Sequence, residues 1–137
     1  VLRNLVKALG PELGGKHLCL LGYTFKAHQD DTRDTPAEKV LQALLSRGCT
    51  VKVYDPALKK STHPQFSSTI AEASEDADAI LLLTDWPVFH NAETWNTIRS
   101  CTKERIVIDG RNALLHEVNL LSDFAYYGVG VPCRLPQ

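Results

Sequence analysis

The stretch that decides the fold spans residues 16–56 and reads KHLCLLGYTFKAHQDDTRDTPAEKVLQALLSRGCTVKVYDP. It contains two short apolar runs, 17–21 and 51–54, each with the length expected of a buried β-strand. Between them, Leu41 and Leu44 lie on one face of a helical pattern. A strand, a helix and a second strand in this order predict a right-handed crossover between two parallel strands.

The ends of the intervening helix are marked in the sequence. Thr35 is a favoured N-cap residue, Pro36 is favoured at the first helical position, and Glu38 completes a capping box. Gly48 follows the last apolar position of the helix, as a C-terminal glycine does. We therefore expect a helix that begins next to residue 36 and ends before residue 48.

The rest of the chain continues the alternation. Further strands are predicted at residues 79–83, 105–108 and 124–127, and further helices at 70–75 and 87–99. For residues 114–121 the pattern does not separate helix from strand. The sequence predicts an α/β fold: a Rossmann-like three-layer sandwich with a mainly parallel sheet of about five strands.

Residues 1–15 differ from the rest. Leu2, Leu5 and Leu9 recur at helical spacing, and this pattern stops at Gly10 and Pro11. We interpret residues 1–15 as the end of an upstream connecting helix and residues 16–137 as the domain proper. The chain contains no Met, and we expect it to be a piece of a longer polypeptide.

Composition excludes several classes. The chain has 137 residues, 44% of them hydrophobic and 23% charged, which favours one packed domain over a disordered chain. The net charge of −1 provides no field that would attract nucleic acid or an anionic membrane. The four cysteines are scattered, and the five histidines lack metal-ligand spacing. We expect no metal site and reduced thiols in the cytoplasm, with Cys19 packed in a strand as a small apolar residue.

Ligands of open α/β sheets bind outside the carboxyl ends of the strands. The first such loop, residues 22–34, is longer than the ~2–6 residues usual there, and its single glycine excludes a G-x-G-x-x-G dinucleotide loop. The loop contains Phe25 next to Lys26, whose ammonium can bind a phosphate as a point charge. It also contains Arg33, whose planar guanidinium can bind a phosphate through two hydrogen bonds. Arg111 follows the fourth strand at the same edge, so Lys26 and Arg111 could bracket a diphosphate or a base and sugar.

Simpler readings stay open at this point. The carboxylates around Arg33 could form a self-paired, solvated loop, and Arg111 follows an Asp-Gly turn signal. Asp55 and Pro56 are interpreted as a turn, and Trp86 as a core residue at a helix entry. No Ser-His-Asp or Cys-His arrangement is evident, so no catalytic residue is assigned in this chain.

Five segments together resemble the C-terminal domain of the UDP-glucose/GDP-mannose dehydrogenase family. They occur in order over nearly the whole chain from Lys16: GYTFK (22–26), DDTRDTP (30–36), GCTVKVYDP (48–56), DADA (76–79) leading to TDW (84–86), and IDGRN (108–112). Gln29 and Thr35 stand where the family commonly has Thr and Ser.

The resemblance implies a division of labour. Such enzymes oxidise the C6 hydroxymethyl group of a nucleotide sugar to a carboxylate with NAD and a cysteine nucleophile. An N-terminal domain, absent from this chain, binds most of the NAD and the C-terminal domain binds the nucleotide sugar, here most simply a UDP-sugar. On this pattern Phe25 and Lys26 contact the substrate, Arg111 binds its nucleotide portion, and Arg33 reaches the NAD phosphates. The full-length enzyme is expected to be a homo-oligomer in the cytoplasm, and the isolated chain to be inactive.

Two other hypotheses remain beside this one. The chain could be a diverged, non-catalytic interaction domain of the same fold. It could also be a different small-molecule enzyme that uses Asp31 or His28 as acid or base, although nothing in the spacing provides such a base with an orienting partner.

Overall fold

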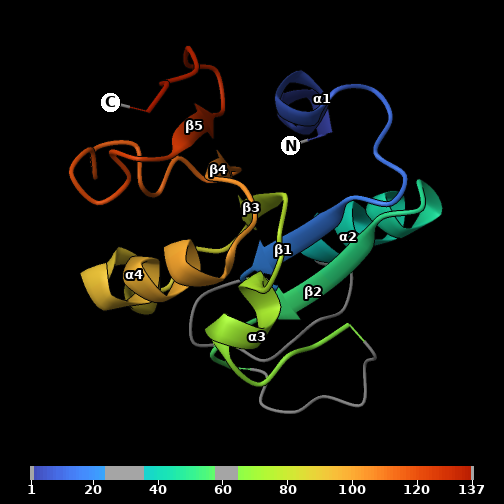
Figure 1. The fold of residues 1–137 in the computed structure, drawn as a ribbon, viewed down its shortest axis with the longest axis horizontal. Coiled ribbons are helices and arrows are strands. Elements are labelled where there is room, and N and C mark those ends of the chain that lie inside the picture. The colour runs from blue at the N-terminus through green and yellow to red at the C-terminus, as the bar shows by residue number, and fades with distance from the viewer. Residues whose placement is uncertain (1, 24–35, 58–64, 137) are drawn as a thin grey trace.

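The structure is a computed structural model that describes residues 2–23, 36–57 and 65–136. The elements, labelled in Figure 1, are α1 (Leu2–Leu9), β1 (His17–Leu21), α2 (Pro36–Ser46), β2 (Thr50–Tyr54), α3 (Ile70–Ser74), β3 (Ala79–Leu82), the 3₁₀ helix η1 (Pro87–His90), α4 (Ala92–Cys101), β4 (Ile106–Asp109) and β5 (Ala125–Gly128). Strands and helices alternate from β1 to β4, as the sequence predicts.

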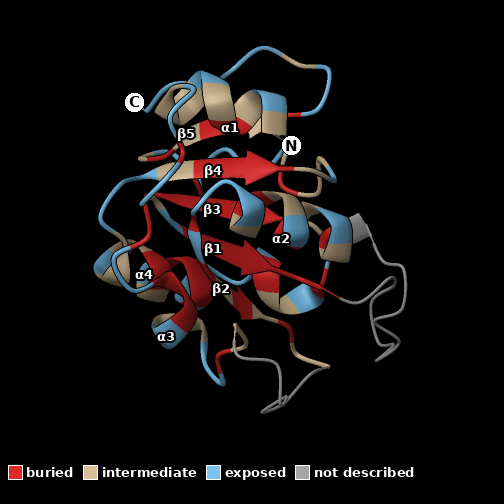
Figure 2. Cartoon of the chain, turned by 90° about the vertical axis from the view of Figure 1, so that its right-hand side faces the viewer, coloured by how far each residue is buried: buried red, intermediate tan, exposed pale blue. Residues whose placement is uncertain are grey.

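The strands form one sheet in the order β2-β1-β3-β4-β5, and every neighbouring pair is parallel. Leu20 in β1 pairs with Val53 in β2 on one side and with Leu81 in β3 on the other. Figure 2 shows the arrows pointing the same way, with the central strands buried. The predicted α/β, Rossmann-like fold with a parallel sheet is confirmed.

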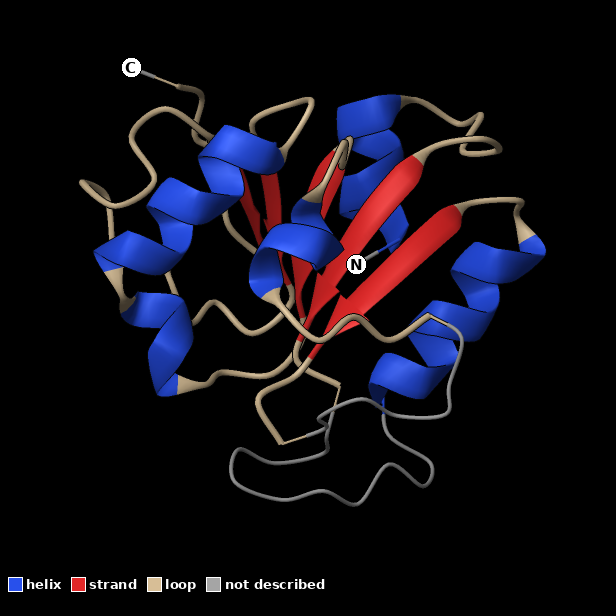
Figure 3. Ribbon diagram, turned by 60° about the horizontal axis from the view of Figure 1, so that its bottom comes forward, coloured by secondary structure: helices blue, strands red, loops and turns tan. Residues whose placement is uncertain are grey.

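Helices cover both faces of this sheet (Figure 3). Alternate residues of β1 face opposite layers: Leu18 and Leu20 belong to the core with α1 and α2, whereas Cys19 and Leu21 belong to the core with α3, η1 and α4. Strands with apolar residues on both faces need a cover on each side, and a parallel sheet provides it through its crossover helices. The molecule therefore has the expected three layers.

The structure differs from the sequence prediction in one helix and describes one segment that the prediction left open. The helix predicted over 87–99 is divided into η1 and α4 at Asn91, whose backbone is extended and whose side-chain oxygen accepts a hydrogen bond from the amide of Glu93 at 2.9 Å. Asn91 is thus an N-cap, and a residue in that conformation cannot continue a helix. Residues 114–121, for which helix and strand were not separated, consist of turns without a regular element.

The N-terminal helix packs on the sheet. Leu5 is fully buried in the same core as Leu13 and Leu18. The side-chain amide of Asn4 donates to the carbonyl of Gly128 at the end of β5, at 2.9 Å. Residues 2–13 therefore share their core with the domain that follows. Among the described residues, no helix has the length and apolarity needed to cross a bilayer.

Candidate functional site

The carboxyl ends of the strands lie level with one another at one edge of the sheet. Leu21 pairs with Tyr54 and with Leu82, and Leu82 pairs with Asp109, so the four strands from β2 to β4 end in line. An open α/β sheet binds its ligands outside the carboxyl ends of its strands. We call this the carboxyl edge.

The chain leaves β1 through a position that only glycine fits. Gly22 has a φ of +85°, and a Cβ there would lie 2.7 Å from both the backbone nitrogen and the Cβ of Thr84. The segment that follows β1 is therefore pressed against the segment that follows β3. Gly22 thus allows the two chain segments to approach each other closely at this edge.

We expect Gly22→Ala to destabilise the chain by about 3 kcal/mol, because a left-handed alanine costs roughly 1 kcal/mol and overpacking adds about 1–3 kcal/mol. The matched control is Gly10→Ala, since Gly10 has a φ of +91° but nothing lies within 4 Å of its added Cβ. Urea unfolding of both variants measures the difference. Equal losses of stability would show that the contact with Thr84 has no cost.

Asp55 joins the ends of β1 and β2. Its carboxylate is 1% exposed and accepts the amides of Tyr23 at 2.6 Å and Ala57 at 2.8 Å. The bond to Ala57 belongs to the turn that the sequence predicts. The bond to Tyr23, 32 residues away in the sequence, was not predicted, because no local pattern indicates it. Tyr23 is itself buried and packs edge-on against Phe66, with ring centroids 5.0 Å apart.

Asp109 is a second buried carboxylate that accepts hydrogen bonds, at the end of β4. It is fully buried and accepts the amides of Arg111 at 3.0 Å and Leu114 at 2.8 Å, and the hydroxyl of Tyr126 in β5 at 2.7 Å. Burial and the hydrogen bond to Asp109 raise the pKa of Tyr126, which therefore stays a hydrogen-bond donor. The start of the loop after β4 is fixed by this carboxylate.

Arg111 is the predicted site residue that the structure describes. Its backbone is held by Asp109, its side chain is exposed, and no described residue forms an ion pair with its guanidinium. An arginine with an anchored backbone and an exposed side chain at the carboxyl edge is available for an anion such as a phosphate, two of whose oxygens can accept from the planar guanidinium.

The other predicted site residues, Phe25, Lys26 and Arg33, lie outside the described residues, and their roles stay predictions. The same holds for the N-cap Thr35 and for the alternative in which the acidic residues around Arg33 pair with it. In the sequence Lys26 comes after β1 and Arg111 comes after β4, and these two strands flank β3.

A histidine lies between two carboxylates at this edge. His90 Nε2 is 2.6 Å from Asp85 Oδ1, and its Nδ1 is 3.5 Å from Glu117 Oε2. Partial burial lowers the pKa of His90, but the hydrogen bonds and charges of Asp85 and Glu117 together outweigh it, so the pKa is raised. No sequence pattern indicates this pair of contacts, since Glu117 is distant in sequence and lies in a loop.

We expect Asp85→Asn to lower the pKa of His90 more than Glu117→Gln does, because the contact with Asp85 is shorter. A raised folded-state pKa stabilises the chain below the unfolded pKa, and this stabilisation is lost as the pH rises through the folded pKa. The stability advantage of the wild type over Asp85→Asn should therefore shrink with rising pH. NMR titration of the His90 ring and thermal unfolding against pH measure both effects. A larger pKa change in Glu117→Gln would contradict this.

Two expectations about buried residues hold. Trp86 is 5% exposed and belongs to the core beneath α4, as predicted for a packing residue. Cys19 is fully buried, and burial raises the pKa of its thiol well above the ordinary value, so it is not a nucleophile. All four cysteines are free. Within the described ranges, no cluster of His, Cys, Asp and Glu could hold a metal ion.

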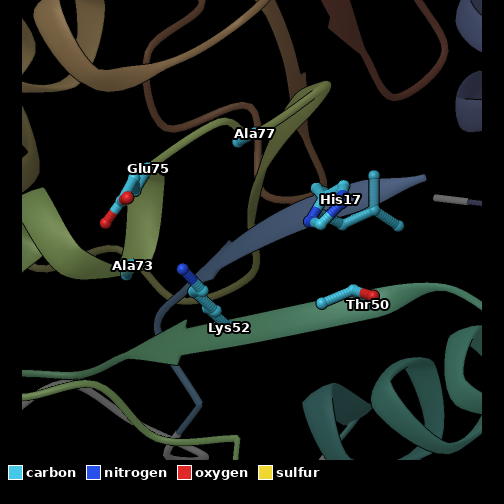
Figure 4. A pocket seen from close by; sticks show the side chains of 7 residues that line it. His17, Thr50, Lys52, Ala73, Glu75 and Ala77 are labelled. Carbon is cyan, nitrogen blue, oxygen red and sulfur yellow. The ribbon is translucent and has the colours of Figure 1, made fainter. Parts of the chain in front are cut away.

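Two hollows elsewhere on the surface do not suit a nucleotide. One has a volume of about 310 Å³ and is lined by Ile70, Val88, Asn91, Glu93, Thr94 and Thr97. Its single charged side chain, the carboxylate Glu93, would repel phosphate. The other lies where β1 and β2 begin, with His17, Lys52 and Glu75 around it (Figure 4), and leaves no room for a water molecule.

The fold and this edge define a class: a Rossmann-like α/β domain with a cationic side chain exposed where such domains bind ligands. Residues 19–116 match the family model described as "UDP-glucose/GDP-mannose dehydrogenase family, UDP binding domain". The match covers most of the chain, which therefore belongs to this family. The resemblance of its motifs to the C-terminal part of the family is confirmed.

Individual relatives agree with this assignment. The chain is 33% identical over 137 residues to a UDP-glucose 6-dehydrogenase of Rickettsia typhi, covering 95% of this chain and 31% of the relative. It is 32% identical over 132 residues to a UDP-N-acetyl-D-mannosamine dehydrogenase of Methanocaldococcus jannaschii, covering 95% of this chain and 30% of the relative. The chain thus spans about a third of the length of these relatives.

A solved structure has the same fold. The UDP-D-ManNAc dehydrogenase of Pyrococcus horikoshii superposes with a TM-score of 0.74 at 28% identity, covering 94% of this chain and 29% of that chain. The relatives named above therefore differ in the sugar that their names contain.

Proposed function

We propose that this chain is the UDP-sugar-binding domain of an NAD-dependent nucleotide-sugar 6-dehydrogenase of the UDP-glucose type, which oxidises the C6 hydroxymethyl group to a carboxylate. The observation on which the proposal rests is Arg111: its guanidinium is open to solvent at the carboxyl edge, inside the segment that matches a UDP-binding domain. The relatives that this chain matches include several UDP-glucose 6-dehydrogenases, which favours glucose as the sugar.

The chemistry of the predicted residues suits this ligand. Arg111 can hold a phosphate oxygen pair with two parallel N–H donors, and Lys26 can add a point charge from the end of β1. Phe25 offers an aromatic face beside Lys26. Together these side chains would bind and orient the nucleotide sugar. We assign no catalytic residue to this chain and propose that its contribution is binding and orientation.

The described residues do not fit a dinucleotide cradle. A backbone that cradles a pyrophosphate must be open to it, whereas Gly22 is pressed against Thr84, with its added Cβ at 2.7 Å from the backbone nitrogen. We propose that NAD binds mainly to an N-terminal domain and that only Arg33 reaches it from this chain. No step of the oxidation is assigned to residues of this domain.

The organisation of the whole enzyme is part of this proposal. Residues 1–15 are the end of a helix that joins the two domains, and residues 16–137 are the nucleotide-sugar-binding domain. The chain spans 31% of the first relative, which leaves space for a domain with the cofactor and the catalytic cysteine. We propose a homo-oligomeric, cytoplasmic enzyme.

Two substitutions in the loop after β1 test the proposed roles. We expect Lys26→Ala to weaken UDP-glucose binding about tenfold or more, because a charge-assisted hydrogen bond contributes roughly 1.5–3 kcal/mol. Arg33→Ala should leave this affinity nearly unchanged, since its partner is NAD. Calorimetric titration of both variants with UDP-glucose measures the difference, and equal losses would contradict the assignment.

A thermal-shift series with UDP, GDP, UDP-glucose and NAD tests the ligand class. Any ligand that binds only the folded chain raises its unfolding temperature. We expect stabilisation by UDP and UDP-glucose and little by GDP or NAD. Stabilisation by none of them at millimolar concentration would favour a non-catalytic interaction domain, and turnover by the isolated chain would favour a different enzyme.

A further inference from the structure

The residue after Arg111 adopts an unusual backbone conformation. Asn112 has a φ of +50°, in the left-handed region that few residues other than glycine enter at low cost. Both polar atoms of its side-chain amide bind the backbone of Val129. Oδ1 accepts from the Val129 amide at 2.7 Å, and Nδ2 donates to the Val129 carbonyl at 2.9 Å. Val129 directly follows β5. Asn112 therefore ties the Arg111 loop to the chain beyond the neighbouring strand.

The end of β5 is shaped around this amide. Gly128 is the last residue of the strand, and a Cβ on it would lie 2.6 Å from Asn112 Oδ1 and 2.7 Å from Val131 Cγ2. A side chain at position 128 would thus push the Asn112 amide away. Two features that no local pattern connects, a left-handed Asn and a strand-terminal glycine, belong to one arrangement.

The arrangement fixes the backbone on both sides of Arg111. The Arg111 amide is bound by Asp109, at 3.0 Å, and the next residue is bound to Val129. The guanidinium itself has no ion-pair partner among the described residues. A ligand that binds an arginine with a fixed backbone loses less conformational entropy than one that must first order the loop.

We call the two hydrogen bonds between Asn112 and Val129 the clamp. The stability of the fold gives little reason for it. Val129 is 51% exposed, and both hydrogen bonds to Asn112 lie at the surface. Exposed hydrogen bonds replace equivalent bonds to water and contribute little net stability. The clamp orders the loop more than it stabilises the fold.

We propose that Asn112 is a positioning residue for the nucleotide: through its two hydrogen bonds to Val129 it holds Arg111 where the diphosphate binds. This inference rests on the proposed function of the carboxyl edge. It assigns to the Asn of the IDGRN segment a role in ligand affinity that is exerted through Arg111 and not by contact with the ligand.

The test is a double-mutant cycle with UDP as the probe, measured by calorimetry on the 137-residue chain. Asn112→Gly keeps the left-handed backbone and removes the clamp, and we expect it to weaken UDP binding about fivefold to tenfold. In an Arg111→Ala background the same substitution should change the affinity less than twofold. Asn112→Asp, which keeps an acceptor but loses the donor to the Val129 carbonyl, should also weaken binding. The control is Asp76→Gly, because Asp76 also has a positive φ, of 56°, next to no predicted site residue.

A wild-type affinity in Asn112→Gly, or an equal loss with and without Arg111, would overturn the inference. Absence of UDP binding by the wild type would instead overturn the proposed function. A measurement without ligand separates failure of this inference from failure of the proposed function. The heteronuclear NOE of the Arg111 amide should fall in Asn112→Gly, whereas Asp76→Gly should leave it unchanged. An unchanged NOE in Asn112→Gly would show that the clamp does not order Arg111.

Discussion

The arrangement of the carboxyl edge depends on the buried carboxylate of Asp109. A carboxylate without exposed surface is tolerated only when hydrogen bonds replace its water, and Asp109 receives three, from the Arg111 and Leu114 amides and the Tyr126 hydroxyl. These bonds join the end of β4, the loop after it and the strand β5. Residues 114–121 contain turns and no regular element, so this loop is held by separate turn hydrogen bonds, and the Asp109 carboxylate fixes its start.

Asp55 provides a second anchor of the same kind on the opposite side of β1. Its bond to the Tyr23 amide, at 2.6 Å, fixes the segment after Gly22 to the end of β2. The two carboxylates therefore hold the two segments from which the predicted ligand-binding residues depart. Their oxygens accept from backbone amides and, at Asp109, from the Tyr126 hydroxyl, and no described residue forms an ion pair with the exposed Arg111, which remains available to an anion. A parallel sheet supplies the common edge, and buried carboxylates set the backbone there.

Much of this could be predicted from the sequence, because strands buried on both faces are continuous in apolar residues and the helix at Pro36 is marked by its capping residues. The positions of the five strands followed from such local patterns. The division of the helix at Asn91 was missed because an N-cap inside an apolar periodicity leaves that periodicity intact. Three long-range contacts were missed for another reason: Tyr23 on Asp55, Glu117 on His90 and Val129 on Asn112 lie far away in the sequence, and only the fold brings each pair together.

The central claim is that this domain binds a uridine nucleotide at its carboxyl edge through Arg111. Amide chemical shifts followed during a UDP titration test it most directly, because they locate the binding site residue by residue. The account predicts progressive shifts of Tyr23 and of residues 109–112, with those of His17 and Thr50, at the opposite edge, unchanged. Shifts confined to the amino ends of the strands, or to the hollow between α3 and α4, would contradict it.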